Sequence, residues 1–480
     1  MNKVRLLNNI YTDKYKLFII ISFMSAVVLF MHSNLEITLL YMCYSFIMLI
    51  MLFFSFSKIN SIFVKLTSTI WYISYVITIP IIYVNIDNFN SVGWNAVGTF
   101  DFSVHDLFYV IGIVVGYFFL FLMSSFIIEV FIKNKYFYTV NNKSYTIKTN
   151  KLIYYLFIFL LLIQFPLDTF MLHNAIGIVG IKQGILPFHL TGILYYYRLF
   201  IIPIVTFILL FSKYNKNYKI ILLLIFLEIV YSGITSVSRS LLILHMLPLL
   251  YYFYIKNNKK MLFISIVMTL ILFSIVSLFR NYIYLVDSFS SINFSEIITF
   301  LFFDNSQNLF TSIFNSVLNI ITRLLGIVEL IPTLYNTYDI KFVSHTYFLE
   351  YFLNLNFFHT NFDAVQYIYG IKLPEDKAYG IALDLFSYIY LSSINILEAF
   401  YLLFIYSFVG IISEKFLKIM LLPYIKENNF ILLFHVAILL SIPNDNIRLL
   451  IFKGIPIIFI IYIFFNIIIK HKYIYKASYQ

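Results

Sequence analysis

Charged and imidazole side chains recur in one long stretch of this chain, residues 280–394, which separates two apolar runs. The stretch is also rich in Phe, Tyr, Leu and Ile, so it differs from an ordinary soluble loop. Acidic, basic and imidazole groups beside apolar segments are what a reaction site needs, and a decorated outer loop is the plainer alternative. The groups concerned are Arg280, Asp304, Arg323, Glu329, His345, Glu350, His359 and Asp363.

Several of these residues could take a proton from an attacking hydroxyl group. An imidazole titrates near neutral pH, which makes His345 and His359 candidate general bases. For each of them, a structural histidine held by hydrogen bonds is the alternative. Asp363 and Glu329 are candidate bases of the carboxylate type. We therefore expect the catalytic base among His345, His359 and Asp363, with Glu329 as a further candidate.

Several familiar reaction sites have no counterpart in this sequence. There is no glycine-rich phosphate loop ending in Lys-Ser or Lys-Thr, and no Gly-x-Ser-x-Gly nucleophile turn. His, Cys, Asp and Glu do not cluster at the spacing of metal ligands, so we expect no metal site and no cofactor. A reaction at this protein must therefore draw on an already activated, membrane-borne substrate or on a gradient.

Composition indicates that these residues belong to a membrane protein, because 61% of the 480 residues are apolar and only 11% are charged. In lipid a helix satisfies its own backbone hydrogen bonds. We predict an all-α integral membrane protein with one polytopic domain over 1–480, about twelve transmembrane helices, and one long, partly helical outer loop over 280–394. Glu129 and Glu228 fall inside spans and are expected to be paired or functional. The predicted spans are 17–33, 36–56, 68–85, 107–132, 152–167, 194–212, 218–232, 240–255, 261–279, 395–413, 429–444 and 449–469.

The positions of the lysines indicate which links between the predicted spans lie on the inner side of the membrane. With the N-terminus inside, every short inner link carries lysine, as the positive-inside rule requires, and both termini are cytoplasmic. The net charge of +11 therefore indicates topology and contact with anionic lipid, and no nucleic-acid partner is expected. Two apolar pieces of the outer loop, 308–334 and 343–358, are either surface helices or a further pair of spans. The inner lysines in the short links are Lys58, Lys65, Lys133, Lys135, Lys143, Lys148, Lys151, Lys213, Lys216, Lys219, Lys256, Lys259, Lys260, Lys415, Lys418 and Lys426.

The arginines have the opposite distribution. Apart from Arg5, every arginine maps to the outer side of the predicted topology. A guanidinium group binds phosphate through two parallel hydrogen bonds, whereas a lysine ammonium is a point charge. An outer group of arginines therefore suits a diphosphate leaving group. Snorkelling to the interface is the alternative, and it weighs more for Arg198 and Arg448. The candidate substrate-binding residues are Arg239, Arg280, Arg323 and Arg198.

The polar turn Ser232–Ser240 reads Ser-Gly-Ile-Thr-Ser-Val-Ser-Arg-Ser and leads into an apolar span and a Lys-rich inner link. This turn resembles the Gly/Ser-Arg-Ser feature of Wzy-type polysaccharide polymerases. The chain departs from that family in having no Gly directly before Arg239. It also carries Ser392 and Ser393 where an Asn-Phe-Gly run is common. A second segment is similar to the family's re-entry after its large outer loop, and it runs through Gly380, Leu383, Leu385, Tyr388, Tyr390 and Gly410.

The resemblance implies a metal-independent, GT-C-like glycosyltransferase at the outer leaflet of a bacterial inner membrane. Such enzymes transfer a growing glycan from undecaprenyl diphosphate to a new lipid-linked repeat unit. In this family arginines of two outer loops engage the substrates, and this carries over to Arg239 and Arg280. The implied partners are an oligosaccharide linked to undecaprenyl diphosphate, membrane lipid and a chain-length regulator protein.

Three other functions compete with this interpretation. A flippase or transporter of lipid-linked oligosaccharide is expected to show internal repeats and ionisable residues at mid-membrane, whereas here such residues crowd the outer face. An O-antigen ligase shares the donor and the layout but uses a different acceptor. A dolichyl-type glycosyltransferase typically needs acidic residues in its first outer loop, where this chain offers only residues His32 to Glu36.

Overall fold

A computed structural model of the chain describes an almost entirely helical protein. Eight of the described helices are long and apolar enough to cross a membrane, and two shorter apolar helices accompany them, Phe18–His32 and Leu241–Ile255. The helical membrane class is thereby confirmed, and the total of about twelve spans stays a prediction. The described residues are 18–84, 104–132, 151–174, 176, 187, 190–212, 218–285, 330–331, 334, 385–393 and 395–421.

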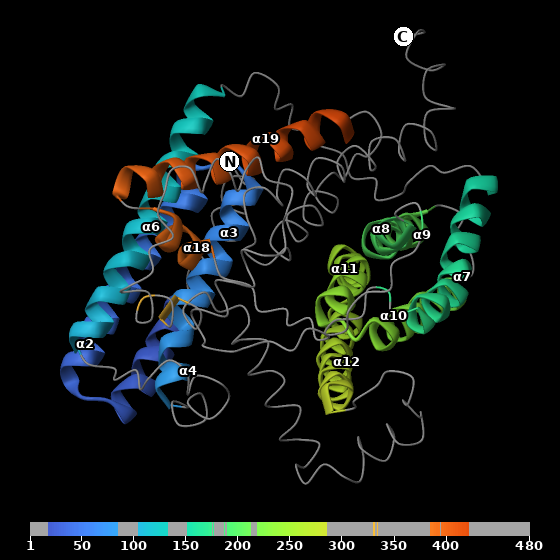
Figure 1. The fold of residues 1–480 in the computed structure, drawn as a ribbon, viewed down its shortest axis with the longest axis horizontal. Coiled ribbons are helices and arrows are strands. Elements are labelled where there is room, and N and C mark those ends of the chain that lie inside the picture. Colours follow the sequence, from blue (N-terminus) through green and yellow to red (C-terminus); the bar gives the residue numbers. More distant parts are fainter. Residues whose placement is uncertain are drawn as a thin grey trace.

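The helices form two groups that lie side by side (Figure 1). The first group has an aromatic core, in which the Trp71 ring lies 4.6 Å from the ring of Phe386 and 4.5 Å from that of Phe121. Its helices are Phe18–His32, α2 (Leu35–Lys58), α3 (Ile62–Tyr72), η1 (Ile73–Ile77), α4 (Thr78–Val84), α6 (Val104–Phe131), α18 (Leu385–Ser392) and α19 (Ile396–Leu421).

The second group has a separate apolar core of Ile, Leu, Phe and Tyr side chains. Its central helix α9 is buried along its whole length, and it packs against α7, α10 and α11. An apolar interior of this kind makes any charged side chain inside it expensive unless that side chain is paired. The helices of this group are α7 (Lys151–His173), α8 (Leu190–Tyr196), η4 (Tyr197–Ile201), α9 (Ile202–Phe211), α10 (Tyr218–Ser236), α11 (Arg239–Ile255) and α12 (Lys259–Leu285).

In each group one helix widens into a π-helical turn shortly before a proline. Pro80 follows η1, and Pro203 follows η4. Hydrogen bonds in a π-helix run from the N–H of residue i+5 to the carbonyl of residue i, and proline has no N–H. The carbonyls five residues before these prolines belong to Tyr75 and Arg198. They accept side-chain hydrogen bonds instead, from a tyrosine hydroxyl of α2 at 3.0 Å and from His245 Nε2 at 2.9 Å.

Three helices of the second group extend beyond the predicted spans. Helix α7 continues through Pro166 to His173, α10 continues to Ser236, and α12 continues through Arg280 to Leu285. The hydroxyl groups at the end of α10 bond back to carbonyls one turn earlier, which satisfies them without ending the helix. The connection between α10 and α11 is therefore much shorter than the predicted polar turn.

Parts of the predicted outer loop pack into the first group of helices. Leu330, Ile331 and Leu334 are buried in its core. Helix α18 also lies in this group, where the Phe386 ring stacks on Tyr75 at 4.6 Å. The other residues between α12 and α18 lie outside the described part of the chain, and so do the predicted spans 429–444 and 449–469.

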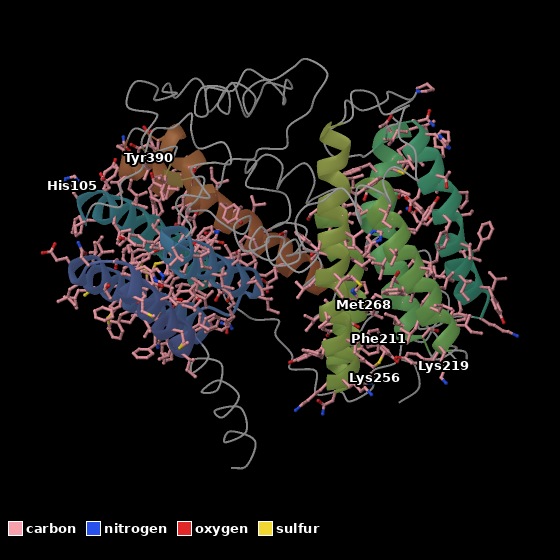
Figure 2. All side chains as sticks on the ribbon, turned by 90° about the horizontal axis from the view of Figure 1, so that it is seen from below. His105, Phe211, Lys219, Lys256, Met268 and Tyr390 are labelled. Carbon is pink, nitrogen blue, oxygen red and sulfur yellow. The ribbon has the colours of Figure 1, made fainter. Side chains whose placement is uncertain are left out.

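Among the described residues of the second group, lysines and arginines lie toward opposite ends. Figure 2 places Lys219 and Lys256 together with Phe211 at one end of these helices. Short connections make α10, α11 and α12 antiparallel neighbours in sequence order. Since α11 has 17 residues, its first residue, Arg239, lies ~25 Å from the lysine end. Arg280 lies in the last two turns of α12, at the same end as Arg239.

Candidate functional site

The second group of helices contains a buried ion pair between Arg198 and Asp168. Arg198 belongs to η4 and Asp168 to the last turns of α7. The guanidinium Nε lies 2.9 Å from Asp168 Oδ1, and the two side chains are only 2% and 0% exposed. This N–H is not aligned for a hydrogen bond, so the contact is an ion pair held by charge. Two opposite charges thus cancel inside an apolar core, where either one alone would be costly.

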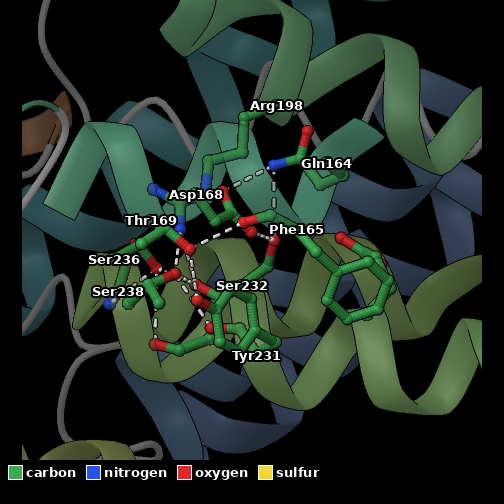
Figure 3. Close-up of polar contacts among 12 residues, drawn as sticks. Gln164, Phe165, Asp168, Thr169, Arg198, Tyr231, Ser232, Ser236 and Ser238 are labelled. Carbon is green, nitrogen blue, oxygen red and sulfur yellow. Dashed lines mark hydrogen bonds and ion pairs between the residues drawn. The ribbon is translucent and has the colours of Figure 1, made fainter. Parts of the chain in front are cut away.

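Polar side chains of α7 and α10 complete the surroundings of this ion pair (Figure 3). Arg198 Nη2 donates to the Ser232 carbonyl at 2.9 Å and to Thr235 Oγ1 at 2.5 Å. Asp168 accepts from Gln164 Nε2 at 2.6 Å through Oδ1, and from the Ser232 hydroxyl through Oδ2. Both charged groups therefore have several hydrogen-bond or ion-pair partners. A buried polar network whose members have such partners makes the core around it rigid.

A second buried pair, Glu228 and His245, lies beside the first. His245 Nδ1 lies 3.0 Å from Glu228 Oε1, and both side chains are 1% exposed. His245 Nε2 lies 2.9 Å from the backbone carbonyl of Arg198, which Pro203 leaves without a π-helical partner. The expectation that Glu228 is paired is confirmed. The other oxygen of Glu228, Oε2, has no hydrogen-bond partner among the described residues.

The connection between α10 and α11 joins this network to Arg239. Val237 has a φ of 52°, a left-handed conformation that is unusual for a β-branched residue and costs of the order of 1–3 kcal/mol. Ser238 caps α11, because its hydroxyl accepts from the Leu241 N–H at 3.3 Å. The Ser236 hydroxyl contacts the Ser238 N–H at 3.3 Å, while Ser236 itself bonds back to the Ser232 carbonyl. The Ser232 carbonyl therefore accepts hydrogen bonds both from Arg198 and from Ser236, the last residue of α10 before the strained connection.

Three of the residues predicted for substrate binding lie on helices of the second group. By the antiparallel order of α10, α11 and α12, Arg198, Arg239 and Arg280 all lie toward the end opposite the lysines. Arg198 is buried and paired, so its side chain does not snorkel outward. Arg239 begins α11, and Arg280 belongs to α12. The other predicted site residues lie outside the described residues, and they are His345, His359, Asp363, Glu329 and Arg323.

The sequence interpretation did not single out Asp168, Gln164 or His245. A signal was present, because Gln164 and Asp168 are one helical turn apart in an otherwise apolar run. Asp168 was instead assigned to the start of an outer link, since the predicted span ended at residue 167. Glu129, predicted to be paired or functional, accepts hydrogen bonds from the backbone N–H groups of Asn60 and Ser61 at 2.8 and 2.6 Å.

Comparison of the chain with known protein families, with curated proteins and with solved structures gives no match. Within the described residues, no group of three or more His, Cys, Asp or Glu side chains is placed to hold a metal ion. This arrangement consists of a buried Arg198–Asp168 ion pair and a buried Glu228–His245 contact, which lie in the same group of helices as Arg239 and Arg280.

Proposed function

We propose that this protein is a polysaccharide polymerase that joins lipid-linked repeat units at the outer face of a bacterial cytoplasmic membrane. The observation that carries the proposal is the placement of Arg239 at the start of α11 and of Arg280 in the last two turns of α12, opposite the end where Figure 2 shows Lys219 and Lys256. By the positive-inside rule the lysine end is cytoplasmic, so the arginine end faces outward. Arginines at the outward end, Arg239 and Arg280, suit the diphosphate of a lipid-linked donor.

The proposed reaction forms one bond and breaks one bond. A hydroxyl oxygen of the acceptor sugar attacks the anomeric carbon of the donor glycan, and the bond from that carbon to the diphosphate oxygen breaks. The diphosphate leaves with the electron pair, and a general base takes the hydroxyl proton. No nucleotide is needed, since the sugar–diphosphate bond already supplies the driving force. The protein contributes positioning and stabilisation of the leaving charge.

The three arginines have different roles in this proposal. Arg239 and Arg280 engage the diphosphate, because they lie at the outer ends of their helices. Arg198 is a positioning residue, since its charge is balanced by Asp168 and its Nη2 holds the end of α10 at Ser232 and Thr235. His345, His359 or Asp363 is the proposed base.

Mixing the purified protein in detergent with lipid-linked repeat units tests the proposal. We expect a ladder of longer lipid-linked glycans without nucleotide and in excess EDTA. Replacing Arg239 or Arg280 by Lys keeps the charge but loses one hydrogen bond to a charged group, which is worth about 1.5–3 kcal/mol. At about 1.4 kcal/mol per tenfold, each variant should lose roughly ten- to a hundredfold in rate. Lys256→Arg, at the opposite end, is the matched control and should keep its rate. Normal ladders from both arginine variants would refute the assignment.

A transporter or flippase of lipid-linked oligosaccharide is the second candidate, and the position of Glu228 favours it. Glu228 lies ten residues after the start of α10 and eight before its end, at the middle of this span. Ionisable residues at that depth are common on substrate and ion pathways. Unchanged repeat units in detergent, together with their translocation when the protein is placed in vesicles, would favour this function. Transfer to a lipid A-type acceptor in place of a repeat unit would indicate a ligase.

A further inference from the structure

The contacts of His245 determine where one of its protons lies. Its Nε2 atom is 2.9 Å from the carbonyl oxygen of Arg198. A carbonyl oxygen only accepts hydrogen bonds, so Nε2 must carry a hydrogen and donate it. The other ring nitrogen, Nδ1, is 3.0 Å from Glu228 Oε1. If the imidazole were neutral and the carboxylate ionised, two acceptor atoms would face each other in a buried contact.

One additional proton converts this repulsive contact into a hydrogen bond. The proton can lie on Nδ1, giving an imidazolium beside a carboxylate, or on Glu228, giving a carboxylic acid that donates to Nδ1. In both arrangements the pair is electrically neutral overall. Without the proton it carries one uncompensated negative charge at the centre of a span, where such a charge is expensive.

Among the described side chains around the pair, no other group compensates for that charge. Asp168 on α7 and Arg198 on η4 are the charged groups nearby, and they already neutralise each other. Tyr197 on η4 uses its hydroxyl to donate to the Leu160 carbonyl at 2.9 Å. Helix α9 and the segment 261–279 of α12 contain no Asp, Glu, His, Lys or Arg. In addition, Glu228 Oε2 has no hydrogen-bond partner among the described residues, so an ionised carboxylate would be poorly solvated there.

We propose that Glu228 and His245 form a binding site for one proton at the centre of the second group of helices. The bound proton also holds the π-helical turn η4, because the same imidazole that shares it is the hydrogen-bond partner of the Arg198 carbonyl. Releasing the proton makes His245 and Glu228 repel and so loosens the turn that carries Arg198. This proton site stands on side-chain geometry and does not depend on the proposed transfer reaction.

Counting the protons released on unfolding tests the proposal. At pH 8 a free carboxyl group is ionised and a free imidazole is neutral, so the unfolded chain keeps no proton for this pair. The wild-type protein in weakly buffered detergent is unfolded with sodium dodecyl sulfate, and the release is read with a calibrated pH indicator. We expect about one more proton from the wild type than from Glu228→Gln, since the Gln amide donates to Nδ1 without an ionisable proton. Equal release from the two proteins would overturn the proposal.

Two further variants serve as a second test and a control. His245→Gln should also lose the extra proton, and it provides the comparison if Glu228→Gln does not fold. His173→Gln changes an exposed histidine at the end of α7 and should release as many protons as the wild type does. An infrared spectrum of the folded wild type locates the proton. A carboxylic-acid band that Glu228→Gln lacks places it on Glu228, and an imidazolium signal that His245→Gln lacks places it on His245. The absence of both signals would contradict the proton site.

Discussion

Neutralising Asp168 should destabilise the protein far more than neutralising an exposed acid. Asp168→Asn keeps the shape of the side chain but leaves the buried Arg198 side chain, 2% exposed, without its ion-pair partner. Breaking a buried pair costs about 3–5 kcal/mol, whereas an exposed pair is worth about 0–1 kcal/mol. Arg198 keeps two neutral acceptors, the Ser232 carbonyl and the Thr235 hydroxyl, so we expect the lower end, about 3 kcal/mol.

A double-mutant cycle with Arg198→Met separates this ion pair from the rest of the network. Each single variant leaves one buried charge, and the double variant Asp168→Asn/Arg198→Met leaves none, so its cost should be well below the sum of the two. In a thermal-shift assay in detergent, ~3 kcal/mol corresponds to a loss of roughly 3 °C in Tm for a chain of 480 residues. Glu36→Gln, at an exposed position in the first turn of α2, is the control and should change Tm little. Strictly additive losses in the double variant would refute the ion pair.

Two further predictions concern packing and topology. A Cβ atom at Gly410 would lie 2.1 Å from a buried phenylalanine ring of α3, while one at Gly116 would meet nothing within 4 Å. Gly410→Ala should therefore lower Tm by about 1–3 °C and Gly116→Ala should not, and equal Tm values would show that the ring moves aside freely. In a Cys43→Ser background, His173→Cys should react with an impermeant thiol reagent in intact cells or spheroplasts, and Asn257→Cys only after permeabilisation. The reverse pattern would invert the proposed orientation.

The sequence by itself determined the class of this protein and the rough course of its helices. A composition with 61% apolar residues requires lipid around it, and runs of apolar residues must then be helical. Eight described helices agree with these runs. The pairing of Glu228 could also be expected from sequence, because a lone acid inside an apolar span must find a partner. The sequence could not show that the partner is His245, because other polar side chains of the chain could equally have paired with Glu228.

Tertiary structure decided which charged side chains pair with each other and, through the pairing of Asp168, how far α7 extends. Asp168 and Arg198 are 30 positions apart and belong to different helices, so no local pattern links them. The hydropathy of the sequence predicts a span that ends at residue 167, just before Asp168. A single sequence shows the free-energy cost of burying this carboxylate but does not show the partner that would neutralise it. The partner across the helix interface removes that cost, and α7 therefore continues to His173. Likewise, Pro203 signals a missing N–H in the sequence, but only the packing of α11 against η4 puts a histidine on the carbonyl that it leaves free.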